Sequence, residues 1–107
     1  MTTKRVAYPC KIKMGGFSCE RIFTLTLANG ESYKSVASYL HFWNSENERL
    51  NKYEPSEGTI DGLVAGMLLK KDKSGFALIE IPDEEIIAVP TSGLISRPQE
   101  VDTNVPV

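Results

Sequence analysis

The stretch FTLTLANGESYKSV, from Phe23 to Val36, decides the fold because apolar and polar residues alternate on both sides of a turn signal. Asn29 and Gly30 tolerate the positive φ of a tight hairpin turn, so the stretch predicts strand, turn and strand. A second stretch, FALIEIPDEEIIAV from Phe76 to Val89, matches it without a gap at an offset of 53 residues. Such self-similarity predicts a β-structure built from two related halves.

The segment before this stretch predicts a first hairpin. Apolar and polar residues alternate from Val6 to Lys13, and a loop over 13–16 brings the next alternating segment back along the same face. The expected cross-strand pairs are Ile12 with Phe17, Cys10 with Cys19, and Val6 with Phe23. Pro9 has no backbone N–H, which predicts an edge strand or a bulge at that position.

The second half predicts three further strands, over 60–71, 76–81 and 86–89, joined by turns over 71–75 and 82–85. From Gly62 to Leu94 a strand, a turn, two paired strands and a Val-Pro-x-x-x-Leu exit follow one another. This order resembles the later strands of an SH3-like small barrel. The resemblance implies a fold and carries no ligand site, because fold does not imply function.

The predicted fold class is therefore mainly β. We expect a small six-stranded antiparallel barrel, SH3-like or made of two three-stranded meanders, since closure removes exposed strand edges. One short helix or irregular linker is expected near 44–54, where Ser45 and Glu48 stand at capping-box spacing. Residues 1–95 are expected to form a single domain, with halves of about 4–43 and 58–95 joined by a polar linker. Residues 96–107 lack periodicity and are expected to be a disordered C-terminal tail.

Charge is divided unevenly along the 107 residues, although the net charge is only −2. Residues 1–53 carry eight basic and four acidic residues, whereas residues 54–107 carry four basic and ten acidic residues. This asymmetry fits a polyanion-binding face, attraction between two halves of one fold, or head-to-tail pairing of copies. A monomer and a homodimer both stay open. No apolar run reaches the roughly 20 residues of a membrane span, and no apolar segment follows the basic start, so a cytoplasmic location is expected.

Residue patterns typical of catalytic or metal-binding sites are sparse in this sequence. Three hypotheses are open for Cys10 and Cys19: a disulfide, a redox pair, or two small apolar residues packed in a core. The core position is favoured in a reducing compartment. With His41 they do not supply the four ligands of structural zinc. His41 has no nucleophile in a local motif and is expected as a partly buried member of an aromatic cluster. No phosphate-binding loop occurs, so the sequence predicts no cofactor, no metal and no enzyme activity.

The remaining candidate for a functional site is a surface where aromatic residues lie beside the excess of basic residues in the first half of the chain. Such rings beside cations are typical of an anchor patch for a protein partner or of a stacking surface for single-stranded nucleic acid, although large rings also plug the end of a barrel. We expect a non-catalytic small β-barrel that acts as a protein interaction or regulatory module. The candidate partner-binding residues are Tyr33, Tyr39, Phe42, Trp43, Lys11, Lys13 and Arg21. The alternative is an RNA- or single-stranded-DNA-binding barrel. It would use the aromatic segment, Tyr39–Trp43, and the basic residues Lys4, Arg5, Lys11, Lys13 and Arg21.

Overall fold

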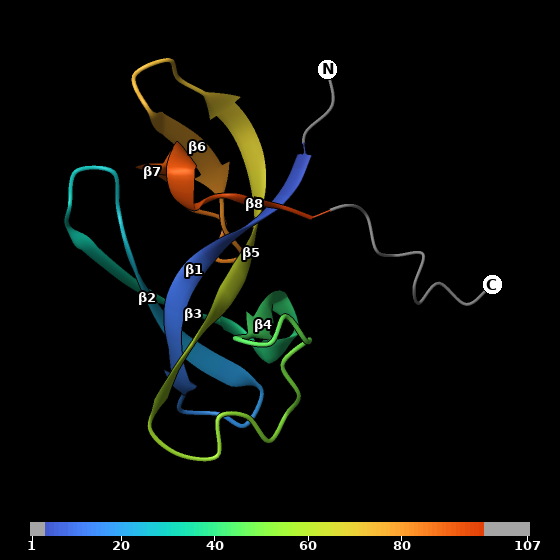
Figure 1. The fold of residues 1–107 in the computed structure, drawn as a ribbon. Helices are drawn as coiled ribbons and strands as arrows, with labels where there is room; N and C mark the ends of the chain where they lie inside the picture. The colour runs from blue at the N-terminus through green and yellow to red at the C-terminus, as the bar shows by residue number, and fades with distance from the viewer. Residues whose placement is uncertain (1–3, 98–107) are drawn as a thin grey trace.

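The computed structural model describes residues 4–97, which form a strongly bent antiparallel sheet (Figure 1). The strands are β1 (Lys4–Met14), β2 (Glu20–Thr26), β3 (Ser32–Ser38), β4 (Phe42–Asn44), β5 (Thr59–Lys71), β6 (Phe76–Glu80), β7 (Ile86–Pro90) and β8 (Ile95–Ser96). Two 3-10 turns, η1 (Tyr39–His41) and η2 (Thr91–Gly93), precede β4 and follow β7. The mainly β class is confirmed, and the segment between β4 and β5 is an irregular linker rather than a helix.

Two long strands, β1 and β5, hold the sheet together. They pair from Lys4 opposite Leu68 to Lys13 opposite Thr59, and they run side by side through the molecule (Figure 1). The strand order is β3-β2-β1-β5-β6-β7, while β4 adds to β5 and β8 adds to β1. Strands from both halves of the sequence therefore share one sheet, which curls into a half-barrel.

The C-terminal end of the described chain packs against the start of β1. Val6 and Ala7 pair with β8, and β2 pairs with β1 only over residues 11–14. Among the described strands, none covers this edge of β1 at Pro9, so β1 is locally an edge strand there, as the missing N–H predicts. The expected C-terminal tail begins at Ser96, the last residue of β8; residues 98–107 of that tail lie outside the described residues.

The core fills the inner side of the half-barrel, because alternate residues of each strand point to one face. Phe23, Phe42 and Ile79 are fully buried there, and the Phe23 and Phe42 rings meet edge to face with centroids 5.5 Å apart. Trp43, the neighbour of Phe42, belongs to a smaller buried cluster with Ala7. Phe42 and Trp43 thus supply one ring to each of the two clusters.

The first hairpin has a different register from the expected one. Phe23 lies opposite Ile12 and not opposite Val6, which is six residues further along β1. A shift by an even number keeps the same side chains on the same face, so apolar alternation does not distinguish the two registers. The loop over 15–19 sets the observed one, since the N–H of Gly15 donates to the carbonyl of Glu20 at 3.0 Å.

The β2–β3 and β6–β7 hairpins, which the sequence aligned, contain the same turn at a different offset. The N–H of Leu27 donates to the carbonyl of Glu31 at 2.8 Å, and the N–H of Ile81 donates to that of Glu85 at 3.0 Å. Equivalent residues are therefore 54 positions apart and not 53.

The one-residue difference matters because it exchanges the two faces of a strand. The gapless alignment placed buried Leu25 on half-buried Leu78, whereas the structural equivalence places it on buried Ile79. The identities that suggested the gapless alignment therefore join residues on opposite faces. A common origin of the two hairpins stays a prediction.

Side chains join the two ends of the curled sheet. Tyr33 and Ser35, on β3, both donate their hydroxyls to Oδ2 of Asp83 in the β6–β7 turn, the Tyr33 bond being 2.8 Å long. In addition, the N–H of Ala28 donates to the carbonyl of Ala88 in β7 at 2.8 Å. These bonds link the outermost strands, so they close the half-barrel where no strand ladder does among the described residues.

We expect the Asp83 contact to make stability depend on pH. Burial by itself raises the pKa of Asp83, but hydrogen bonds from Ser35, from the backbone N–H of Glu85 and from Tyr33 outweigh it, so the pKa lies below its usual value. A lowered pKa stabilises the fold above the unfolded value of about 3.9, and that contribution disappears as the pH falls through the folded pKa. Asp83→Asn should lose about 1 kcal/mol at neutral pH and show a shallower decline below about pH 4.

Urea denaturation across this pH range measures both effects. Asp72→Asn is the matched control, because Ser74 also lowers the pKa of Asp72 but within a single exposed turn. Equal pH profiles for the two variants would contradict a closing role for Asp83.

Candidate functional site

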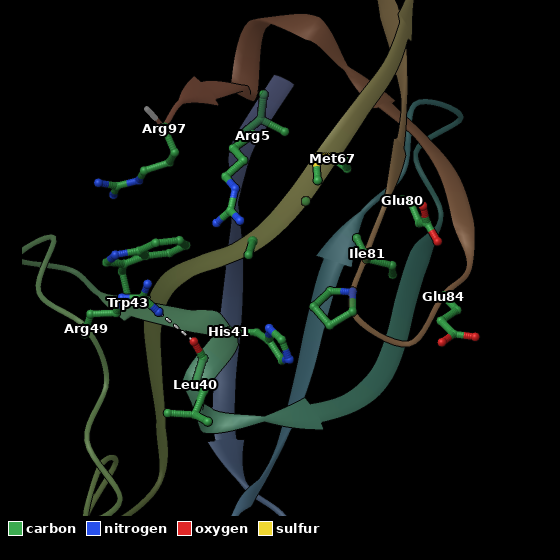
Figure 2. Close-up of a pocket in the computed structure, with 14 residues that line it drawn as sticks. Arg5, Leu40, His41, Trp43, Arg49, Met67, Glu80, Ile81, Glu84 and Arg97 are labelled. Atoms are coloured by element: carbon green, nitrogen blue, oxygen red, sulfur yellow. Dashed lines mark hydrogen bonds between the residues drawn. The ribbon is translucent and has the colours of Figure 1, made fainter. Parts of the chain in front are cut away.

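A pocket of about 430 Å³ opens beside the middle of β5 (Figure 2). This volume is in the range of small-ligand sites, about 300–1,000 Å³. The pocket exists because two strands that share one edge of β5 do not meet. β4 pairs with β5 as far as Val64, and β6 pairs from Met67 onward. Ala65 and Gly66 lie between them in the pocket wall, without a strand partner on this edge in the described part of the chain.

Trp43 forms one wall of the pocket, and two arginines cover its ring. The Cζ atoms of Arg97 and Arg49 lie 4.5 Å and 5.1 Å from the ring centroid, within the range of cation–π attraction. Arg49 also donates from Nη1 to the carbonyl of Leu40 at 2.8 Å. Only 6% of Trp43 is exposed. The indole is therefore held in place by guanidinium groups and is not free to stack on a nucleobase.

The loop after β4 is folded so that Arg49 returns to Trp43. Oδ1 of buried Asn44 accepts hydrogen bonds from the N–H groups of Glu46 and Glu48, at 2.9 Å and 3.0 Å. The N–H of Asn44 donates to the carbonyl of Glu48 at 2.8 Å, and an isolated bridge then joins Arg49 to Trp43. An asparagine that binds nearby backbone groups in this way stabilises a tight loop.

Arg97 is tied to the start of β1, where Arg5 lies. The N–H of Arg97 donates to the carbonyl of Arg5 at 3.0 Å, and its Nη2 donates to Oδ1 of Asn47 at 3.1 Å. The Nε atom of Arg97 is buried and has no hydrogen-bond partner among the described residues. An atom without exposed surface is closed to a ligand, so Arg97 contributes positive charge to the pocket and not a free Nε donor.

Arg5 supplies a third guanidinium group. It points into the pocket beside Trp43 (Figure 2) and makes neither a hydrogen bond nor an ion pair with any described side chain. The pocket therefore contains donors on Arg5 that the described protein does not use. Guanidinium groups form strong paired hydrogen bonds with carboxylates and phosphates, which makes this wall an anion-binding surface.

The opposite wall is acidic. Glu80, at the end of β6, and Glu84, in the turn after it, line the pocket across from the arginines, with Met67 and Ile81 between the two sides (Figure 2). Neither carboxylate has a hydrogen-bond or ion-pair partner among residues 4–97. The pocket is thus polar at both ends and apolar in the middle.

His41 lies at the rim and is exposed, not buried in an aromatic cluster as expected. Desolvation and the charge of Arg49 lower its pKa, so it is neutral at pH 7. Among the described lining residues, positive charge therefore comes from the arginines.

The structure separates the seven residues proposed for partner binding. Phe42 is fully buried in the core and Arg21 is fully buried beneath the linker, so these two are not available to a partner. Tyr33 is half-buried and bonded to Asp83, and Tyr39 lies beside Arg21, whose Cζ is 5.4 Å from its ring centroid. Of the four aromatic residues, Trp43 alone lines the pocket.

Lys11 and Lys13 are exposed on β1 but line no part of this pocket. Thr24 lies between Lys11 and Lys34 in the cross-strand register, so these lysines share one sheet face. Nζ of Lys11 is 2.6 Å from a carboxylate oxygen of Asp61. The basic hairpin and the aromatic segment, which the sequence joined into one surface, are therefore distinct parts of the fold.

The two cysteines are not cross-strand neighbours. Cys10 is buried in β1 opposite Gly62 of β5, while Cys19 is exposed in the loop before β2, and both thiols are free. The expected pairing is wrong because the first hairpin has the shifted register described above. Cys10 keeps the expected core position, and Cys19 does not.

We expect one fast and one slow thiol in the folded protein. Burial, and then the charge of Asp61, raise the pKa of Cys10 to about 12, and only the thiolate reacts. An aromatic disulfide reagent should label Cys19 rapidly and Cys10 only after denaturation. Cys19→Ser should abolish the fast phase, whereas Cys10→Ser should retain it. Rapid labelling of both thiols in the native wild type would contradict the buried position of Cys10.

Other site classes receive no support from this part of the chain. Within residues 4–97, no group of three or more histidine, cysteine or acidic side chains is placed to hold a metal ion. The same residues include no helix of sufficient length and apolar character to cross a membrane. Comparison of the chain with protein-family models, curated proteins and solved structures finds no match. The pocket is therefore the feature of the described chain that bears on function.

Most residues of the pocket carry no signal in the sequence. Arg5 was named only among the basic residues of the nucleic-acid alternative, and Arg49, Arg97, Glu80 and Glu84 were not named as site residues. The arginines are 44 and 48 positions apart, and no local motif connects them. A gap between two strands on one edge of β5 brings them together, and such a gap has no sequence pattern.

Proposed function

We propose that this protein is a non-catalytic interaction module that binds an extended segment of a protein partner in the pocket beside β5. The observation that carries the proposal is the pocket itself, in which apolar side chains lie between a wall of arginines and a wall of glutamates. An apolar pocket with charged side chains on opposite walls fits an extended peptide, whose alternate side chains point to the same side.

The RNA- or single-stranded-DNA-binding alternative draws less support. Such proteins stack bases on exposed aromatic rings along a positively charged groove. Here Trp43 is covered by two arginines, Arg21 is buried, and Lys11 is paired with Asp61. The acidic wall of the pocket also repels phosphates.

Selection from a random peptide library displayed on phage tests the proposal with the full chain. Selected peptides should change the emission of Trp43, the single tryptophan, and should shift the amide resonances of Ala65 and Gly66. Selection of no peptide, or of peptides that leave these signals unchanged, would contradict it. An oligothymidylate that binds with a steep salt dependence would favour the alternative instead.

A further inference from the structure

We infer that the segment bound in this pocket carries one carboxylate and one cationic side chain, separated by an apolar residue, and docks in a single direction. This inference rests on the proposed function and names the chemistry of its ligand. Its basis is the distribution of charge in the pocket, with three arginines on one wall and two glutamates on the other (Figure 2).

The arginine wall fits a carboxylate. The guanidinium of Arg5 has no hydrogen-bond or ion-pair partner among the described residues, and Arg97 beside it adds a second positive charge. A carboxylate accepts two parallel hydrogen bonds from a guanidinium, and it also offers an acceptor to a second donor. Arg97 is held by Asn47 and by the backbone of Arg5, so its charge is already fixed in position before a ligand arrives. Such preorganisation reduces the entropy lost on binding.

The middle of the pocket fits an apolar side chain. Met67 is half-buried and Ile81 is 2% exposed, and both line the pocket between the charged walls. Pro82 and Ala65 add further apolar surface. Buried apolar area favours association, and methionine adapts its shape to different ligands.

The acidic wall selects the charge at the other end of the ligand. The carboxylates of Glu80 and Glu84 lack described partners, so they attract a cation and repel a second anion. A doubly acidic segment satisfies the arginines but places a like charge against the glutamates, and a doubly basic segment does the reverse. A segment with opposite charges satisfies both walls, and only in one direction across β5, because Met67 lies opposite Arg5 on one side and opposite Glu80 on the other.

Four blocked pentapeptides test this inference directly: Glu-Ser-Val-Ser-Lys, Lys-Ser-Val-Ser-Glu, Glu-Ser-Val-Ser-Glu and Lys-Ser-Val-Ser-Lys, each acetylated and amidated. In an extended chain the first, third and fifth side chains lie on one side, so the charged ends and the valine face the pocket together. We expect one of the two peptides with opposite charges to bind about tenfold more tightly than the other three, as hydrogen bonds to charged groups allow. Titrations followed by Trp43 emission measure the affinities.

Variants assign the effect to the two walls. Arg5→Gln should weaken the preferred peptide about tenfold, and Glu84→Gln should bring the doubly acidic peptide closer to it. Lys13→Gln is the matched control, because Lys13 is exposed at the other end of β1 and does not line the pocket. Arg5 is also exposed, and its side chain has no described bond, so its loss should leave the unfolding transition unchanged.

The outcomes separate this inference from the proposed function. Library peptides that bind at the pocket without the paired charges would overturn the inference and leave the function standing. Equal affinities for the four pentapeptides, or no effect of Arg5→Gln, would do the same. Competition by inorganic phosphate at millimolar concentration, with no preference between peptides, would indicate a simple anion site. Failure of both the library and the pentapeptides would overturn the function together with the inference.

Discussion

Replacement of Arg21 by methionine is expected to lower the free energy of unfolding by about 3–5 kcal/mol, a large share of the roughly 5–15 kcal/mol typical of a domain. Arg21 is fully buried, and its guanidinium donates to the backbone carbonyls of Glu54, Ser18, Glu20 and Lys52 at 2.6, 2.7, 2.8 and 3.0 Å. A fifth carbonyl, that of Asn51, lies at 3.5 Å. The side chain therefore connects β2 to the linker between β4 and β5.

The large effect follows from what is left behind. Methionine fills a similar volume but donates no hydrogen bond, so several carbonyls become unsatisfied at about 1–3 kcal/mol each, in a sum that is not additive. Burial lowers the pKa of Arg21, which reflects the cost of enclosing its charge, and the carbonyl bonds offset that cost. Loss of the guanidinium that bonds these carbonyls should loosen the linker between β4 and β5 before the rest of the fold.

Urea denaturation measures the change. Lys13→Met, which removes an exposed cation from β1, should stay within about 0.5 kcal/mol of the wild type. Arg21→Lys should be intermediate, because an ammonium group keeps the charge but lacks the planar fork that reaches carbonyls on two segments. An Arg21→Met protein as stable as the Lys13→Met protein would show that the carbonyl bonds contribute nothing.

Replacement of Gly62 by alanine is expected to lower the free energy of unfolding by about 3 kcal/mol. A Cβ atom at this position would lie 2.4 Å from the carbonyl oxygen of Trp43 and 2.5 Å from Cδ1 of Ile12. Ile12 can change its rotamer, but the Trp43 oxygen belongs to the backbone of β4, so β4 must move away from β5. Because β4 carries Trp43, the same change should shift the emission of the single tryptophan.

Gly16→Ala is the matched control for this substitution. The nearest atom to a Cβ at Gly16 is Oε1 of Glu20 at 3.9 Å, an ordinary contact, so this variant should be neutral or more stable by up to about 1 kcal/mol. Thermal unfolding and tryptophan emission compare the two proteins. Equal stability of the two variants would show that β4 does not pack against β5 at the observed distance.

Alternation of apolar residues predicted the class of fold correctly because burial of one strand face follows directly from a period of two. It did not predict register, as Phe23 shows, because an even shift preserves the face of every residue. The sequence also predicted Arg21 as a partner-binding residue, although this side chain is buried as fully as Phe23. The side chain became acceptable inside only because linker carbonyls, more than 30 positions away, surround it.

The candidate site also combines features that the sequence predicts with features that only the tertiary structure decides. The aromatic segment was visible in the sequence, but whether its rings lie in the core or on the surface depended on which strands covered them. Phe42 enters the core and Trp43 turns to the pocket, because successive residues of a strand point to opposite faces. The partners of Trp43 in the pocket, Arg49 and Arg97, could not be inferred from local patterns.

By itself, the sequence determined that this chain forms β-hairpins with turns near Asn29 and Asp83, because turn chemistry and alternation are local properties of the backbone. Only the tertiary structure decided where those hairpins meet. Contacts between distant residues set the register of β1, the burial of Arg21 and the gap on the edge of β5. The pocket with its two charged walls follows from that gap, since Arg5, Arg49 and Arg97 become neighbours only after the sheet has curled.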